Sequence, residues 1–342
     1  MARVRKTARL LGIAIAAMLL SSSIALIADT VNVDDASGVE IAIEAPVERV
    51  VSIYGIGTYY FYALGQGDRV IQGGYIGVKT LAQAPPPLLS IEPALAEKMT
   101  FGVPNLEAIA AVSPDLIVVD ATRHAEFAEL AEQVGLVVLR QKLETPESIP
   151  QAMMQLANLF GDDAVTRASE YGDFVDRLLT SIERVSMGIA PEDRPSVLFL
   201  GSTPQRVASG DMLQRRMIEL AGGTCVSCEA IGGWSDVDLE QIIVWNPDVM
   251  IVPAYAGFEP QDLAADPDWA PLEAVQSGRV YKMPRVMGPW DTAVPDFILG
   301  VLWMSDRFYP GAAEFDWATE TAIFYDRFYD IDLTAEWLSA SE

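Results

Sequence analysis

The chain has 342 residues, 51% of them hydrophobic, so it is long enough for one large or two medium domains with a buried core. This composition excludes a disordered chain. A formal net charge of −25 repels nucleic acid and anionic lipid, so we expect neither as a direct partner.

The first 28 residues have the order of parts expected of an export signal. Residues 10–20 form an uncharged apolar run, small residues follow, and Asp29 is the first acid. Four basic residues precede the run: Arg3, Arg5, Lys6 and Arg9. We predict a signal peptide over 1–28, cleaved near Ala28, and hence a periplasmic protein. The alternative is an uncleaved anchor helix, because residues 10–28 are nearly long enough to span a membrane.

The next segment predicts a hairpin followed by a βαβ unit. Residues 31–43 alternate apolar and polar side chains around an Asp- and Gly-containing turn at 34–38. A short buried strand at 49–53 precedes a helix that ends at Gly65, and a second strand begins at Val70 and stops at Gly73. The order strand, helix, strand predicts a parallel sheet.

An internal repeat is the main feature of the sequence. Residues 105–120 read NLEAIAAVSPDLIVVD, and residues 238–253 read DLEQIIVWNPDVMIVP, at an offset of 133. In each copy an Asn or Asp caps a short helix, Pro ends it, and an apolar run forms a strand buried on both faces. Further strands are expected at 135–139 and 278–281. The chain therefore contains two related α/β lobes.

The segment between the copies has helical rather than strand periodicity. Apolar residues recur at helical spacing from Ile149 to Val185, with Gly161 as a candidate break. We predict an N-terminal lobe at 29–145, a connecting helix at 146–194 and a C-terminal lobe at 195–342. A helical connector implies stiff lobes and a small opening motion.

Several segments resemble the substrate-binding proteins of bacterial ABC importers for ferric siderophores, haem, cobalamin and related metal complexes. They are VERVVSIYGIGTYYFYALGQGDRVIQGG (47–74), NLEAIAAVSPDLIVV (105–119), GGWSDVDLEQIIVWNPDVMIV (232–252), LEAVQSGRVYKMP (272–284) and GPWDTAVPDFILGVLWMSDRFYP (288–310). The resemblance implies two Rossmann-like lobes joined by one long backbone helix, with the ligand in the cleft between them. It implies a receptor that works with the permease subunits of an importer.

Ligand-binding side chains are expected on loops at the carboxyl ends of the strands, where open α/β sheets bind ligands. Aromatic side chains stack on flat ligands, and arginine matches carboxylate or catecholate oxygens. For each aromatic residue, the alternative to ligand binding is packing in the core. For each arginine, the alternative is a surface ion pair. The candidates are Tyr54, Tyr75, Arg123, Arg206, Trp234, Tyr255, Arg285 and Trp290.

Glu126 and Glu259 occupy equivalent positions in the two copies. The resemblance implies that one acidic residue on each lobe docks to arginines of the permease, and these two are the candidates. Two solvated carboxylates are the alternative, and neighbouring acids could serve instead: Glu129, Asp262 or Glu314.

His124 and the two cysteines could carry other chemistry. His124 is the only histidine. A lone histidine is usually a surface or hydrogen-bonded residue, and an axial ligand to haem iron is the alternative. Because export favours disulfides, we predict one between Cys225 and Cys228. Free thiols, or a redox or metal half-site, are the alternatives. No metal site of the protein itself is predicted.

We therefore expect a receptor for a metal chelate, with an iron complex (a ferric siderophore or haem) as cargo, no cofactor of its own and a monomeric state. The alternatives are the same receptor class binding molybdate, tungstate or a corrinoid, and a secreted enzyme that uses the interlobe cleft. No catalytic motif supports an enzyme. Gly55 and Gly57 follow a strand as in a dinucleotide site, but Tyr60 stands where the third glycine would be.

Overall fold

The computed structural model describes residues 29–100, 102–143, 145–312 and 314–333. The predicted signal peptide at 1–28 lies outside the described residues. Within the described part of the chain, no helix combines the length and the apolar character needed to cross a membrane.

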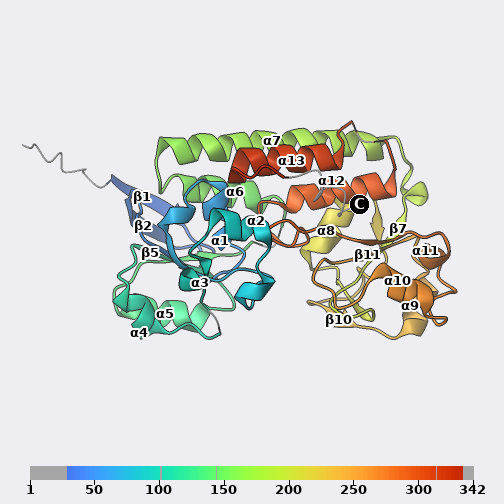
Figure 1. Ribbon diagram of the computed structural model, residues 1–342, viewed down its shortest axis with the longest axis horizontal. Coiled ribbons are helices and arrows are strands. Elements are labelled where there is room, and N and C mark those ends of the chain that lie inside the picture. The colour runs from blue at the N-terminus through green and yellow to red at the C-terminus, as the bar shows by residue number, and fades with distance from the viewer. Residues whose placement is uncertain (1–28, 101, 144, 313, 334–342) are drawn as a thin grey trace, which may run out of the picture.

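Two four-stranded parallel sheets form the centres of the two lobes (Figure 1). The first has the order β4-β3-β5-β6, with β3 (Val50–Ser52), β4 (Val70–Gly73), β5 (Leu116–Asp120) and β6 (Val138–Gln141). The second has the order β12-β11-β7-β9, with β7 (Ser196–Phe199), β9 (Thr224–Cys225), β11 (Val249–Val252) and β12 (Val280–Lys282). In both sheets the first and third strands in chain order form the centre, so the two lobes share one topology.

The repeat contributes the same parts to each lobe, as predicted. Asn105 caps α4 (Leu106–Ala111) through the Ala108 amide, and Asp238 caps α9 (Leu239–Trp245) through the Gln241 amide. The aspartate after each proline has a further role. Asp115 accepts hydrogen bonds from the amides of Glu48 and Arg49 just before β3, and Asp248 accepts one from the Ser196 amide at the start of β7. Each copy thus fixes the start of the neighbouring central strand.

The predicted hairpin is present at the outer end of the first lobe. β1 (Asp29–Asp34) pairs antiparallel with β2 (Glu40–Ala45). Asp35 Oδ1 accepts hydrogen bonds from the amides of Ser37 and Val39, which closes the turn.

Shorter helices cover the outer parts of both lobes. In the first lobe they are α1 (Thr58–Ala63), α2 (Pro86–Ile91), α3 (Leu95–Lys98) and α5 (Ala125–Gln133). In the second they are α8 (Leu213–Leu220), α10 (Pro260–Ala265) and α11 (Glu273–Gln276), beside a small antiparallel pair of β8 (Arg206–Val207) and β10 (Ser235–Asp236).

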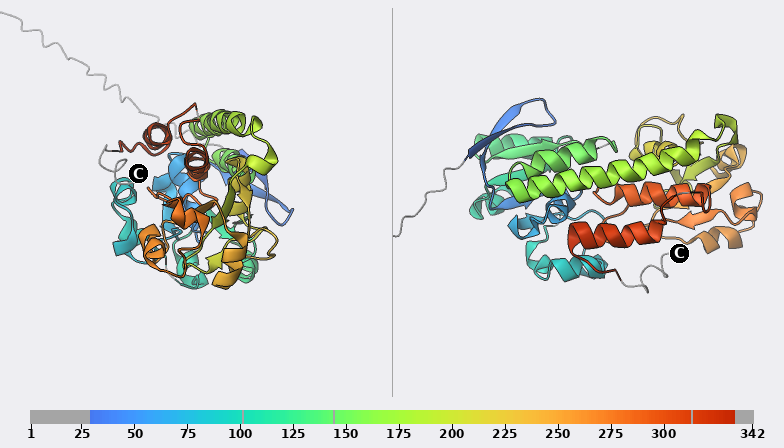
Figure 2. Two further views of the ribbon diagram at one scale, coloured as in Figure 1. Left: turned by 90° about the vertical axis from the view of Figure 1, so that its right-hand side faces the viewer. Right: turned by 90° about the horizontal axis from the view of Figure 1, so that it is seen from above.

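The connector is helical and breaks where the sequence predicts. α6 (Ser148–Ala157) ends before Gly161, whose φ of +96° favours glycine, and α7 (Asp162–Met187) follows. α7 runs along both lobes, with α12 (Phe297–Phe308) and α13 (Trp317–Tyr329) beside it (Figures 1 and 2). Since α13 contacts α1 as well, this last described helix packs back towards the first lobe.

One apolar cluster continues through both lobes under these helices. It contains Val50 of β3, Tyr171 of α7, Phe199 of β7 and Phe297 of α12. Separate clusters fill the other face of each sheet. The lobes therefore share a core, which supports the expectation of a stiff junction. The predicted domain boundaries at 145 and 194 stay predictions.

Candidate functional site

The carboxyl ends of β3 and β4 lead into two loops that pack closely against each other. The Gly74 amide donates to Ser52 O at 2.8 Å and the Ile76 amide to Gly55 O at 3.1 Å. A Cβ on Gly55 would lie 2.9 Å from Ile76 N, and one on Gly57 would lie 2.6 Å from Gln141 Oε1. The two glycines thus serve loop packing, which explains a Gly-x-Gly pattern without a nucleotide.

Tyr54 and Tyr75 belong to the core of the first lobe in this structure. Both side chains are buried. The Tyr75 hydroxyl lies 2.8 Å from that of Tyr62, which donates to Glu92 Oε2 at 3.0 Å. Burial raises the pKa of Tyr75 well above its ordinary value.

A hollow of about 230 Å³ lies at the ends of β3, β4 and β5. It is lined by Ile53, Gln72, Gly74, Asn105 and His124, among others. The neighbouring Arg123 is exposed, and its amide donates to Asp120 Oδ1 at 2.7 Å. The candidate loop after β5 therefore borders a hollow, with His124 rather than Arg123 in its wall.

His124 is a poor candidate for a metal ligand. Its Nδ1 accepts a hydrogen bond from the Asp120 amide at 3.0 Å, and burial lowers its pKa. The neutral ring then carries its proton on Nε2, which leaves no free nitrogen for iron. Among the described residues, no cluster of three or more His, Cys, Asp or Glu side chains could hold a metal ion.

In the second lobe the structure brings Arg206 and Trp234 together at the end of β7. A Cβ on Gly201 would lie 3.0 Å from Trp234 Cε3 and 3.1 Å from Arg206 Cγ, so both side chains pack against this glycine. Arg206 also forms an ion pair with Asp236 at 3.3 Å, and both partners are partly exposed. Exposed pairs of this kind contribute little stability, so the guanidinium stays available to a ligand.

Tyr255 lies on the loop after β11, which adjoins the loop after β7. The Gly257 amide in this loop donates to Ser202 O, which joins it to the loop after β7. Tyr255 is 38% exposed, and its hydroxyl donates to Asp291 Oδ2 at 2.8 Å. Gln214 Nε2 donates to the Asp291 carbonyl at 2.8 Å. Burial raises the pKa of Asp291 to about 6, although hydrogen bonds from the Tyr255 and Gln214 side chains to its carboxylate lower it.

Arg285 connects the strand-end loops of the two lobes. Its Nη1 donates to Gly77 O, after β4, at 3.2 Å, and its Nε donates to Met287 O at 2.9 Å. Two buried phenols make similar connections: Tyr60 of α1 donates to Ala293 O at 2.7 Å and Tyr171 of α7 to Pro295 O at 2.9 Å. The carboxyl ends of β4 and β12 therefore face each other across the junction.

Trp290 is fully buried beside this junction. Its Nε1 lies 3.4 Å from the Tyr325 hydroxyl. In this structure it is a core side chain rather than a stacking surface. Of the predicted aromatic residues, Tyr255 is exposed and Trp234 half-buried, whereas Tyr54, Tyr75 and Trp290 are buried; their role in ligand binding stays a prediction.

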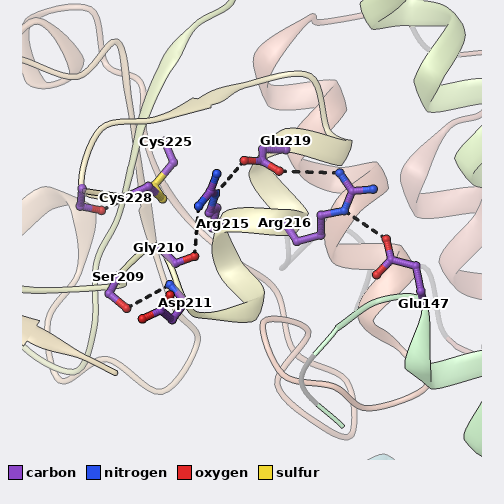
Figure 3. A network of polar contacts seen from close by, with 10 residues as sticks. Glu147, Ser209, Gly210, Asp211, Arg215, Arg216, Glu219, Cys225 and Cys228 are labelled. Atoms are coloured by element: carbon purple, nitrogen blue, oxygen red, sulfur yellow. Dashed lines mark hydrogen bonds and ion pairs between the residues drawn. A yellow bond between two sulfur atoms is a disulfide. The ribbon is translucent and has the colours of Figure 1, made fainter. Parts of the chain in front are cut away.

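A chain of ion pairs crosses between the lobes near α8 (Figure 3). Arg216 pairs with Glu147, just before α6, at 3.1 Å, and with Glu219 at 3.6 Å; Glu219 also pairs with Arg215 at 2.8 Å. Cys225 and Cys228 form a disulfide beside this network, with Cα atoms 5.6 Å apart. A Cβ on Gly210 would lie 2.2 Å from Cys228 O, so the disulfide loop packs directly on this glycine.

Glu126 and Glu259 occupy equivalent places in the two lobes. Glu126 lies in the first turn of α5, the helix after β5, and Glu259 is the N-cap of α10, the helix after β11. Both are exposed. Glu259 differs in that it forms an ion pair with Lys282.

Three residues at the junction were missed by the sequence reasoning: Asp291, Gln214 and Asp296. The Asp296 carboxylate accepts hydrogen bonds from Tyr325 and Tyr329. A signal existed for the two aspartates, because they are the only charged residues between Arg285 and Asp306. A lone charge in an apolar stretch is buried only with hydrogen-bond partners.

Two lobes of one topology, joined by a long helix and facing each other through their strand-end loops, define a two-lobed binding protein. The chain belongs to the periplasmic binding protein family, whose model matches residues 50–286. It therefore has the receptor role of that family.

The most similar relatives differ in what their names say they bind. The molybdate-binding protein MolA of Haemophilus influenzae is 24% identical over 67% of this chain and 66% of its own length. A vitamin B12-binding protein of Vibrio vulnificus is 26% identical over 62% of this chain and 73% of its own length. Among solved structures, an ABC transporter solute-binding protein from Sulfurospirillum deleyianum is 21% identical, covers 91% of this chain and 98% of its own, and superposes with a TM-score of 0.78, which shows the shared fold.

Proposed function

We propose that this protein is an exported receptor that captures a metal chelate and delivers it to an ABC importer, with an iron complex such as a ferric siderophore or haem as cargo. The observation that carries the proposal is that Arg206 and Trp234 pack on the loop after β7, while Tyr255 lies on the adjoining loop after β11. Arg285 reaches the first lobe from the same edge of the sheet. An accessible guanidinium beside partly exposed aromatic rings suits a ligand that has flat apolar faces and anionic oxygens.

The relatives support this class of cargo without fixing it. Vitamin B12 is itself a metal chelate, and one relative is named for binding it. Molybdate is the second candidate, because MolA is another relative. An oxyanion would depend on Arg206, Arg285 and backbone amides rather than on the aromatic rings.

The remaining parts of the proposal follow from the receptor role. The leader at 1–28 would direct export to the periplasm and be cleaved. The receptor acts as a monomer, has no resident cofactor and catalyses no reaction. Glu126 and Glu259 would contact the permease subunits from one lobe each. A secreted enzyme would require a catalytic group in the junction, and turnover of a bound compound would be its sign.

Fluorescence titration tests the cargo. Purified protein is titrated with haem, a ferric tris-catecholate siderophore, cobalamin and molybdate, and the emission of its seven tryptophans is followed. We expect saturable quenching by an iron chelate and at least a tenfold weaker affinity in Trp234→Ala, because stacking on that ring is lost. Trp317→Phe, on α13, is the control and should bind normally. Quenching by molybdate alone would overturn the chelate proposal.

A further inference from the structure

A second hollow, of about 520 Å³, lies in the C-terminal lobe between α10 and α12. It is lined by β12 and the residues that follow this strand, from Val280 to Arg285. Trp303 and Arg307 of α12 line it as well. β12 is the edge strand of its sheet, so one side of its backbone is not covered by another strand. This volume falls in the range of pockets for small organic ligands.

The hollow is basic in an otherwise acidic protein. Lys282, Arg285 and Arg307 line it, and Glu259 is its only acid. Glu259 forms an ion pair with Lys282. Two guanidinium groups also line the hollow, in a chain whose formal net charge is −25. A local positive field of this kind attracts anions.

Arg307 is held mainly by aromatic rings and has only a loose ion pair. Its guanidinium carbon lies 5.4 Å from the ring centre of Trp303, 5.6 Å from that of Tyr281 and 5.7 Å from that of Trp317. Its carboxylate neighbour Asp306 is 3.7 Å away, too far for a good hydrogen bond. Aromatic faces stabilise the cation without removing its charge.

Buried donors in the wall of the hollow lack acceptors. Trp303 is 1% exposed, and its Nε1 has no hydrogen-bond partner; the same is true of Arg307 Nε. An unsatisfied buried donor costs about 1–3 kcal/mol, so such groups usually have a partner. Both donors lack an acceptor oxygen, which is what an anionic ligand supplies.

We propose that this hollow, whose lining does not include Arg206, Trp234 or Tyr255, binds a small organic polycarboxylate. Several donors around a hollow of this size fit a ligand with two or more carboxylates better than a single tetrahedral oxyanion. One carboxylate would lie by Arg307 and Trp303, and another by Lys282 and Arg285.

Nuclear magnetic resonance of protein with ¹⁵N-labelled tryptophan tests the site. Tricarballylate is the probe, acetate and sulfate are the comparison anions, and NaCl holds the ionic strength constant. The Trp303 indole signal, assigned with Trp303→Phe, should shift saturably with tricarballylate. Arg307→Gln should raise the Kd at least tenfold, while Arg184→Gln, an exposed arginine of α7, should leave it unchanged.

Lys282→Gln is a milder second variant, because Lys282 makes none of the ring contacts of Arg307; it should raise the Kd at least threefold. The proposal would be overturned if tricarballylate caused no saturable shift. It would also be overturned if both site variants bound tricarballylate with the Kd of the wild type. Sulfate binding as tightly as tricarballylate would overturn the polycarboxylate class. Chelate affinity should stay normal in Arg307→Gln, which separates this site from the cargo site.

Discussion

Asp296 is a fully buried carboxyl group at the start of α12, held by the hydroxyls of Tyr325 and Tyr329. Burial raises its pKa to about 6, although both hydroxyls oppose the rise. Aspartate in an unfolded chain has a pKa of about 3.9. Between this pH and 6, the folded protein therefore binds the proton on Asp296 more tightly than the unfolded chain does. This contribution to stability is therefore complete below about pH 4 and is lost as the pH rises through 6.

Replacing Asp296 with Asn should remove this pH dependence. Between pH 4.5 and 7.5 the free energy of unfolding of D296N should rise relative to the wild type by about 1–3 kcal/mol, since a shift of about two pKa units corresponds to ~3 kcal/mol at most. Urea unfolding at both pH values measures the difference. Asp268→Asn, at an exposed aspartate, is the control. An identical difference between D296N and wild type at both pH values would contradict the account.

At the scale of single residues, the sequence predicted which types would gather at the strand ends but not which would be exposed. Tyr54 and Tyr75 follow strands as expected, yet the close packing of the two glycine loops draws them into the core. Trp290 is buried because α12 and α13 cover it. Such contacts join residues far apart in the chain, and no local pattern encodes them.

At the scale of elements, the repeat gave the most reliable predictions. Its capped helices and buried strands occur at the expected places, as does the break at Gly161 in the connector between the two copies. These features depend on neighbouring residues, such as a cap and the amide three positions later. The return of α13 to α1 and the shared strand order of the sheets depend on distant contacts, and the sequence did not specify them.

The repeat also provides a matched test of docking. Glu126→Lys combined with Glu259→Lys should reduce import at least tenfold and leave ligand affinity unchanged, because like charges would then meet the permease arginines. Glu107→Lys with Glu240→Lys makes the same charge change at equivalent exposed positions one helix earlier and should transport normally. Transport assays in cells that carry the importer measure both. Normal import by the first pair would reject the docking role.

At the scale of the whole molecule, the lobes are joined by more than the connecting helix. α7, α12 and α13 lie together along both lobes, and one core continues beneath them (Figure 2). Arg285 and the ion pair of Arg216 with Glu147 add links at the junction. This arrangement favours a receptor that holds its cargo with little movement of the lobes.

The central claim is that one ligand is held by strand-end loops of both lobes. Hydrogen–deuterium exchange with and without the iron chelate that quenches the tryptophans tests it most directly. We predict slower exchange at residues 53–57 and 121–124 of the first lobe and at 201–206 and 253–257 of the second. Slower exchange confined to one lobe, or to neither, would contradict the account.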